Sequence, residues 1–321
     1  MNNFTIFGQN QTVPANLIGG REGHSGSFGR DMAMSIPTTM SGHEALALAG
    51  IDWTIESTPL SDHMAAPNAD TVWISQRTDN SAIVGVNGKR HNVIQNDVLA
   101  EFGDTVRQIV PEARYVQGGQ KLGGKTTFLI LDLGRDFDLG GGDVVKRNIM
   151  FGTHHNGGRL FGLGVNGRMM CSNQWSSFTK GSKLISIAHT ASAEDRIKMA
   201  HRTLQASLAE FDEWDRALVE LLNTPMRAND AFKAIAGPRP DKEGRALTEW
   251  ENRIDRMWAE YSEDFNADLV GTGLGVLMAA QGVDEHRGRV KQGQREEQRI
   301  GRLIDNKYPL AERAMKILVP S

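Results

Sequence analysis

Cysteine is almost absent from this chain, which has one in 321 residues, so an internal disulfide framework is excluded. Long apolar runs are absent as well, since no stretch reaches the roughly eighteen residues that span a bilayer. The first residues, MNNFTIFGQNQTV, carry neither the basic n-region nor the apolar h-region of a signal peptide. With 39% apolar and 23% charged residues the composition is that of a globular protein, and we expect a cytoplasmic location and no membrane partner.

Negative charge is missing from one long stretch of the chain. There are 39 acidic residues and the net charge is −3, yet none lies between Asp143 and Glu194, where an even spread would place about six. The same stretch is rich in positive charge, with Lys146, Arg147, Arg159, Arg168, Lys180, Lys183, His154, His155 and His189. A buried core would lack both signs, so the pattern favours a local surface for a polyanion over a chance gap.

Short β-like runs separated by glycine turns dominate the middle of the chain. Between residues 114 and 189 they are RYVQ, TTFLILDL, VVKRNIMF, RLFGLGV, RMMCSN and LISIAH, a pattern typical of a meandering antiparallel sheet. Ser192 follows, with Glu194 and Asp195 in the next turn, and it is predicted to cap a long helix that runs to Leu222.

The flanking regions complete an α+β fold. Ser41 and Glu44 form a capping-box pattern, DTVWISQR and SAIVGVNG resemble strands, Asn87-Gly88 signals a turn, and NDVLAEFGDTVRQIV is amphipathic. Later helices are expected at about 246–263, 285–304 and 309–318. We therefore predict an α+β fold with a central meandering sheet packed by a long helix. The chain divides into an irregular N-terminal arm (1–42), an α+β core (43–223) and a helical C-terminal region (224–321).

The segment GGQKLGGKTT contains the letters of a phosphate loop, G-x-x-x-x-G-K-[ST], ending at Lys125 and Thr126. That motif binds phosphate when a helix begins at the lysine. Here TFLILDLG follows, and its β-branched and apolar residues predict a strand. We interpret the segment as a glycine-rich hairpin whose Lys121 and Lys125 are available to phosphate, with a nucleotide-hydrolysing loop as the alternative.

Metal binding and covalent catalysis find little support in the sequence. The candidate zinc ligands are His154, His155, Cys171 and His189. Neither C-x-x-C nor H-x-x-x-H occurs among them, and adjacent histidines on a strand point to opposite faces. Cys171 lies in a strand-like run with nothing nearby to activate it, and the aspartates of LDLGRDFDLGGGD suit turns. We predict no metal, no cofactor and no enzymatic activity.

The basic sheet is the strongest functional signal. Cationic side chains neutralise backbone phosphates, and aromatic faces stack bases without reading sequence. The residues predicted to bind nucleic acid are Lys121, Lys125, Lys146, Arg147, His154, Arg159, Arg168, Trp175, Lys180 and Lys183. The C-terminal run HRGRVKQGQREEQRIGR is a secondary candidate for phosphate contact or for an ion pair between subunits.

Several motifs together resemble a phage/plasmid-like family of domains of unknown function, numbered nine-three-two. They are ALALAGIDWTIESTPL, IVGVNGKRHNVIQNDVLAEF, RMMCSNQW and IAHTASAEDRIKMAHRTL, and the likeness runs from about residue 41 to 318. His91 stands where the family usually has a tyrosine. The positions that match the family motifs are Asp52, Trp53, Gly85, Gln95, Asn96, Arg168, Cys171, Asn173, His189, Thr190, Asp284 and His286.

Strands followed by a long helix are also similar to the fold of single-strand annealing recombinases of the Rad-fifty-two and RecT group. That resemblance implies a ring-forming homo-oligomer that holds single-stranded DNA, or alternatively duplex DNA, in a basic groove without hydrolysing a nucleotide. The leading prediction is therefore a phage-type DNA-binding and annealing protein. The alternatives are a phosphate-loop NTPase or nuclease, and a phage accessory protein that inhibits a host system.

Overall fold

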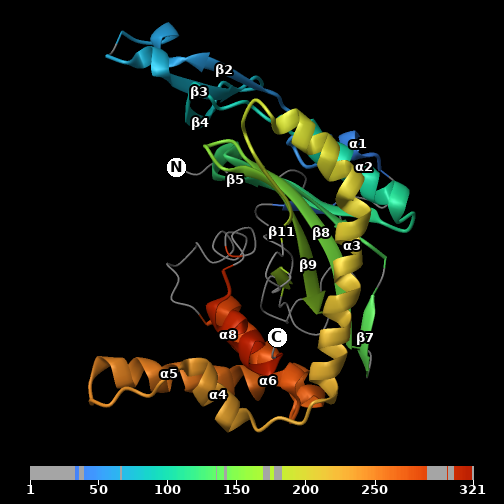
Figure 1. Ribbon diagram of the computed structural model, residues 1–321, viewed down its shortest axis with the longest axis vertical. Coiled ribbons are helices and arrows are strands. Elements are labelled where there is room, and N and C mark those ends of the chain that lie inside the picture. Colours follow the sequence, from blue (N-terminus) through green and yellow to red (C-terminus); the bar gives the residue numbers. More distant parts are fainter. Residues whose placement is uncertain are drawn as a thin grey trace.

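Most of the predicted strands pair in one antiparallel sheet (Figure 1). The structure is a computed structural model, and it describes residues 33–35, 40–65, 67–134, 136–140, 143–168, 174–176, 183–287, 302 and 307–319. Within that part of the chain the sheet has the order β1-β5-β6-β8-β9-β10, formed by Ala33–Ser35, Arg114–Lys121, Thr126–Asp132, Asp143–His154, Arg159–Arg168 and Gln174–Ser176. β7 (Phe137–Gly140) pairs with β8, and β11 (Lys183–Ala188) pairs with β9.

A second, three-stranded sheet projects from one end of the main sheet (Figure 1). It consists of β2 (Ile55–Pro59), β3 (Val72–Arg77) and β4 (Ile83–Gly88), and the short 3-10 turns η1 (Leu60–Asp62) and η2 (Ala69–Thr71) connect β2 to β3. The Asn87-Gly88 turn is displaced from its predicted place. Asn87 stays in β4 opposite Trp73, and the chain turns at residues 89–90.

The helices surround the main sheet. α1 (Gly42–Leu48) and α2 (Asp97–Ile109) lie between β1 and β5 in the chain, and α3 (Ala193–Asn223) follows β11. The C-terminal region contains α4 (Ala228–Ala236), α5 (Arg245–Tyr261), η4 (Asp264–Leu269), α6 (Gly273–His286) and α8 (Pro309–Leu318). The predicted α+β fold, with a long helix on a meandering antiparallel sheet and C-terminal helices, is confirmed. Among the described helices, none is both long enough and apolar enough to cross a bilayer.

One predicted helix cap needs correction, and one helix was not predicted. Ser192 precedes α3 as predicted, but its hydroxyl contacts the Thr190 hydroxyl at 3.3 Å and makes no capping bond, whereas the Ser41–Glu44 capping box of α1 is complete. The sequence did not predict α6 (Gly273–His286), because this helix is buried on every side and so has no polar face to reveal its period. The helix predicted at about 285–304 falls mostly outside the described residues. Residues 288–301 and the arm before Ala33 lie outside the described residues.

Both faces of the main sheet are covered by hydrophobic side chains. On β6, Phe128 and Ile130 belong to a cluster shared with the C-terminal helices, whereas Leu129 and Leu131 belong to a cluster shared with α1, α2 and the first half of α3. This alternation follows from the two-residue period of a strand. A basic surface therefore has no room over the middle of the sheet, and it has to lie at an end or an edge.

Candidate nucleic-acid interface

Four of the predicted cationic residues gather at the end of the main sheet next to the small sheet. Pairing places Lys121 opposite Thr126, and Thr126 opposite His154, across three neighbouring strands. Arg159 begins the next strand, after the turn that follows His154, and Lys125 lies in the turn between β5 and β6. We call Lys121, Lys125, His154 and Arg159 the sheet-end cluster.

The cluster presents charge to solvent. Lys125 and Arg159 are exposed, and Lys121 and His154 are half-buried. Arg159 is held by Ser186, whose hydroxyl accepts from Nε at 2.7 Å and whose carbonyl oxygen accepts from Nη2 at 2.9 Å. Within the described residues no carboxylate pairs with Lys121, Lys125 or Arg159. The positive charge of this end is therefore available to an external anion.

The turn between β5 and β6 has an unusual backbone. Leu122, Gly123 and Gly124 have φ angles of 53°, 67° and 98°, and the Leu122 side chain is 44% exposed. A leucine with positive φ costs roughly 1–2 kcal/mol, so this turn is held in place by its surroundings. Trp53 packs against Gly124, where an added Cβ would come within 2.9 Å of the indole ring. The strand β6 begins at Thr126, so the helix that a phosphate loop requires is absent here, as predicted.

Lys146 and Arg147 do not belong to this cluster. Lys146 and Arg147 are near the opposite end of β8, eight residues from His154 or about 26 Å along the strand. Lys146 forms an ion pair with Asp136, and Arg168 pairs with Val145 at the same end. The side chains of Arg168, Trp175 and Lys183, and all of Lys180, lie outside the described residues. The described cationic residues thus occupy two separate ends of the sheet.

The C-terminal basic run is described only at its two ends. Arg287 forms ion pairs with Glu260 at 2.7 Å and with Glu263 at 2.9 Å, so its guanidinium is engaged inside the protein. Arg302 lies close to Asp284 in the C-terminal helical region, and residues 288–301 between them lie outside the described part. Arg287 is therefore not available for the phosphate contact or the ion pair between subunits that we predict for this run.

Directly beneath the sheet-end cluster lies a buried polar network centred on Asn96. Its Nδ2 donates to the carbonyl oxygens of Ile51 at 2.9 Å and Trp53 at 3.2 Å. This fixes Oδ1 as an acceptor, which receives the Thr127 hydroxyl at 2.7 Å and contacts His155 Nε2 at 3.1 Å. One amide therefore joins the segment before β2, the strand β6 and the end of β8.

The bonding partners determine the protonation of two buried histidines. Because Asn96 Oδ1 can only accept, His155 carries its proton on Nε2, and its Nδ1 is buried without a hydrogen-bond partner. His189 Nδ1 donates to the Asn92 carbonyl at 3.2 Å, so its Nε2 accepts from Thr153, 3.1 Å away. Burial lowers the pKa of His155 to about 3 and that of His189 to about 4, with neighbouring histidines adding repulsion. Both rings are neutral at physiological pH.

Comparison with known families identifies the family of this chain. The model of the family described as Domain of unknown function (DUF932) matches residues 83–304, more than half of the chain. The chain belongs to the DUF932 family. Searches of curated proteins and of solved structures each return no match, so the likeness to single-strand annealing recombinases stays a prediction.

Several residues that the sequence motifs single out meet in this network. Gln95 brackets Ile55, accepting from its N–H and donating to its carbonyl, both at 2.9 Å. Gly85 lets β4 approach the His155 carbonyl, which would be 2.2 Å from an added Cβ. Together with Trp53, Asn96 and His189, these residues build one junction between the two sheets. Sequence reasoning missed Thr127 and Thr153, because a threonine inside a strand reads simply as a β-former.

His91, at the position where the resemblance implies a tyrosine, stacks on His189 with ring centroids 4.7 Å apart and planes 7° apart. We expect His91→Tyr to preserve this contact and to change the free energy of unfolding by less than about 0.5 kcal/mol, whereas His91→Ala lowers it by about 1 kcal/mol. Urea titration at pH 7.5 measures both variants. A tyrosine variant as unstable as the alanine variant would show that stacking is not what position 91 supplies.

The metal prediction concerned His154, His155, Cys171 and His189. The structure describes no group of three or more metal-binding side chains, and Cys171 lies outside the described residues. His154 and His155 point to opposite sides as predicted, since His154 contacts Thr126 and Phe161 whereas His155 contacts Asn96. His154 is half-buried and His155 is buried.

Proposed function

We propose that the protein binds single-stranded DNA through the sheet-end cluster and anneals complementary strands without hydrolysing a nucleotide. The observation that carries this proposal is the alignment of Lys121, His154 and Arg159 across adjacent strands, with Lys125 beside them and no described carboxylate paired with the lysines or the arginine. A nucleic acid strand crossing the strand ends would pass Lys121, Lys125, His154 and Arg159 in turn. Such phosphate contacts supply affinity without sequence preference.

The surroundings of the cluster suit a flexible single strand better than a folded partner. The neighbouring turns after β5 and β8 lie side by side, because His155 N–H donates to the Lys125 carbonyl at 2.8 Å. They contain Gly123, Gly124, Gly157 and Gly158, which allow a backbone to approach closely. Exposed Leu122 at the tip offers an apolar surface for a base.

Annealing and self-association are the further parts of the proposal. The strands of the main sheet are followed directly by the 31-residue α3, the order expected from the similarity to single-strand annealing recombinases. With a net charge of −3, a protomer attracts DNA only through its local basic surface. A homo-oligomer that aligns the sheet-end clusters of its subunits would form one continuous basic groove.

The test is a salt titration of oligonucleotide binding by fluorescence anisotropy. We expect Lys125→Ala with Arg159→Ala to weaken binding and to reduce the slope of log K against log[salt] by about 1.4, the value for two lost single-strand phosphate contacts. The matched control is Arg239→Ala with Lys242→Ala, which removes two exposed cations from the loop between α4 and α5. Binding by the first variant that equals wild type at every salt concentration would refute the proposed interface.

A further inference from the structure

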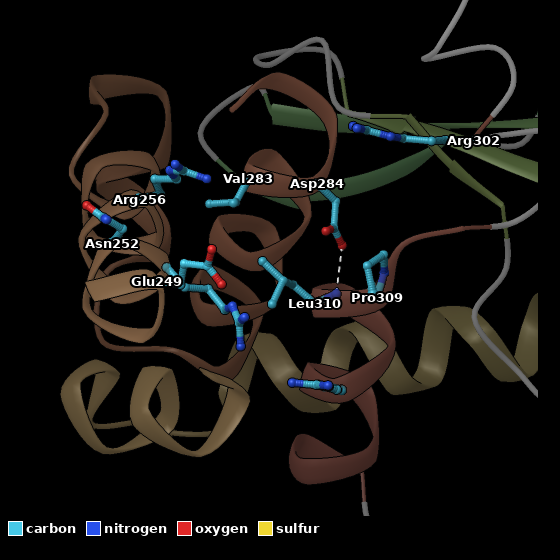
Figure 2. A pocket seen from close by; sticks show the side chains of 10 residues that line it. Glu249, Asn252, Arg256, Val283, Asp284, Arg302, Pro309 and Leu310 are labelled. Carbon is cyan, nitrogen blue, oxygen red and sulfur yellow. Dashed lines mark hydrogen bonds between the residues drawn. The ribbon is translucent and has the colours of Figure 1, made fainter. Parts of the chain in front are cut away.

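A cavity of about 430 Å³ lies between α5, α6 and α8, apart from the sheet-end cluster. Four of its lining residues are arginines: Arg253 and Arg256 from α5, Arg302, and Arg313 from α8. Figure 2 shows Arg256 on one side of the cavity and Arg302 on the far side, with Asp284 of α6 between them. Three separate segments of the chain thus direct guanidinium groups toward one space.

The carboxylates that line the cavity are already engaged. Asp284 Oδ2 accepts from the backbone N–H groups of Leu310 at 2.9 Å and Ala311 at 3.1 Å, and so caps the first turn of α8 (Figure 2). Glu249 accepts from Arg245 Nε at 2.8 Å. Burial raises the pKa of Asp284 to about 6, although the N–H groups of Ala311 and Leu310 and the charge of Arg302 act in the opposite direction.

Two of the arginines are left with unmatched charge. Arg253 Nη1 donates to the Ala236 carbonyl at 2.7 Å and so has a structural role at the end of α4. Arg256 and Arg313 have no ion pair within the described part of the chain. Like charges around a partly enclosed space repel one another, and an anion relieves that repulsion. Guanidinium groups suit phosphate oxygens, which they bind in pairs.

The remaining lining narrows the class of anion. Val283, Pro309 and Leu310 form an apolar wall, and Asn252 supplies an amide that can both donate and accept. The volume is in the range of small-molecule sites and far exceeds the size of a bare phosphate ion. We infer that this cavity binds a nucleoside phosphate, with the phosphate among its arginines and the base against Pro309 and Leu310. Its source is either a free nucleotide or one unit of a DNA strand.

Isothermal titration calorimetry of the full chain with thymidine monophosphate tests the inference. We expect one bound molecule per chain, an affinity at least about tenfold lower in Arg256→Ala with Arg313→Ala, and no binding of thymidine, which lacks the phosphate. Lys316→Ala is the matched control, because Lys316 is an exposed cation one turn from Arg313 on α8 that does not line the cavity. Circular dichroism confirms folding, and the single Arg313→Ala variant, at an exposed position, serves if the double variant does not fold.

Oligothymidine distinguishes the two sources. Weaker oligothymidine binding in the double arginine variant, with competition by thymidine monophosphate, identifies a unit of the strand as the occupant, whereas unchanged oligothymidine binding identifies the free nucleotide. No heat from thymidine monophosphate in wild type, together with unchanged oligothymidine binding in the variant, overturns the inference. The inference is independent of the proposed function. If wild type binds no oligothymidine, while both wild type and Lys125→Ala with Arg159→Ala bind thymidine monophosphate, only the DNA interface is refuted.

Discussion

Replacing Asn96 by alanine is expected to lower the free energy of unfolding by about 3–5 kcal/mol, a large fraction of the stability of a typical domain. Asn96 is 2% exposed, and its amide satisfies the carbonyls of Ile51 and Trp53 and contacts Thr127 and His155. Alanine leaves these groups buried without their partner, and each loss costs roughly 1–3 kcal/mol. Equilibrium urea unfolding at pH 7.5, followed by circular dichroism, measures the difference.

Asn92→Ala is the matched control for that measurement. Asn92 is exposed, and it contacts His189 through its backbone N–H and carbonyl, which alanine retains. We expect a change of less than about 0.5 kcal/mol, as for most exposed substitutions. Similar losses in the two variants would mean that the amide of Asn96 does not organise the junction.

Acid is expected to destabilise the protein steeply through His155 and His189. Both pKa values in the folded state, about 3 and about 4, lie below the ordinary value of 6.5. Below pH 6.5 the unfolded chain therefore binds protons that the folded chain refuses, and stability falls as the pH falls. At about 1.4 kcal/mol per pH unit for each ring, the two histidines together remove on the order of 5 kcal/mol by about pH 4.5.

A double variant, His155→Gln with His189→Gln, separates the acid sensitivity of these two rings from that of the rest of the chain. Glutamine keeps a polar group near Nε2 but does not titrate, so the double variant starts less stable at pH 7.5 and loses stability more slowly toward pH 4.5. His91 and His154 lie near His155 and His189 and repel them when charged, so His91 and His154 stay unchanged in every variant. Parallel stability curves for the variant and wild type would exclude these two rings as the source of the acid sensitivity.

The sequence predicts those parts of the fold that carry a periodic signal. The main strands, the capping box at Ser41 and the helices α2, α3, α5 and α8 show alternation, amphipathicity or caps, and the structure confirms them. α6 has none of these signals, because all its residues are buried. The pairing of β10 and β11 with the same edge of β9 depends on tertiary contacts, which leave no periodic pattern in the sequence.

The candidate sites were predicted less completely than the fold. Closeness in the sequence favours a single surface for the ten predicted residues, but a strand carries Lys146 and His154 to opposite ends of the sheet. The cavity was missed for the opposite reason. Arg256 and Arg313 are far apart in the chain, and each looks like an ordinary charge on an amphipathic helix until α5 and α8 pack together.

The long helix α3 has a consequence for how the protein unfolds. It spans about 46 Å, with Leu204 packed in the cluster on one face of the sheet and Leu218 and Leu221 packed in the cluster on the other. Neither cluster can melt without removing the support of half of this helix. The two cores are therefore thermodynamically linked, and the sheet and the C-terminal helices behave as one cooperative unit in which a change at one end is felt at the other.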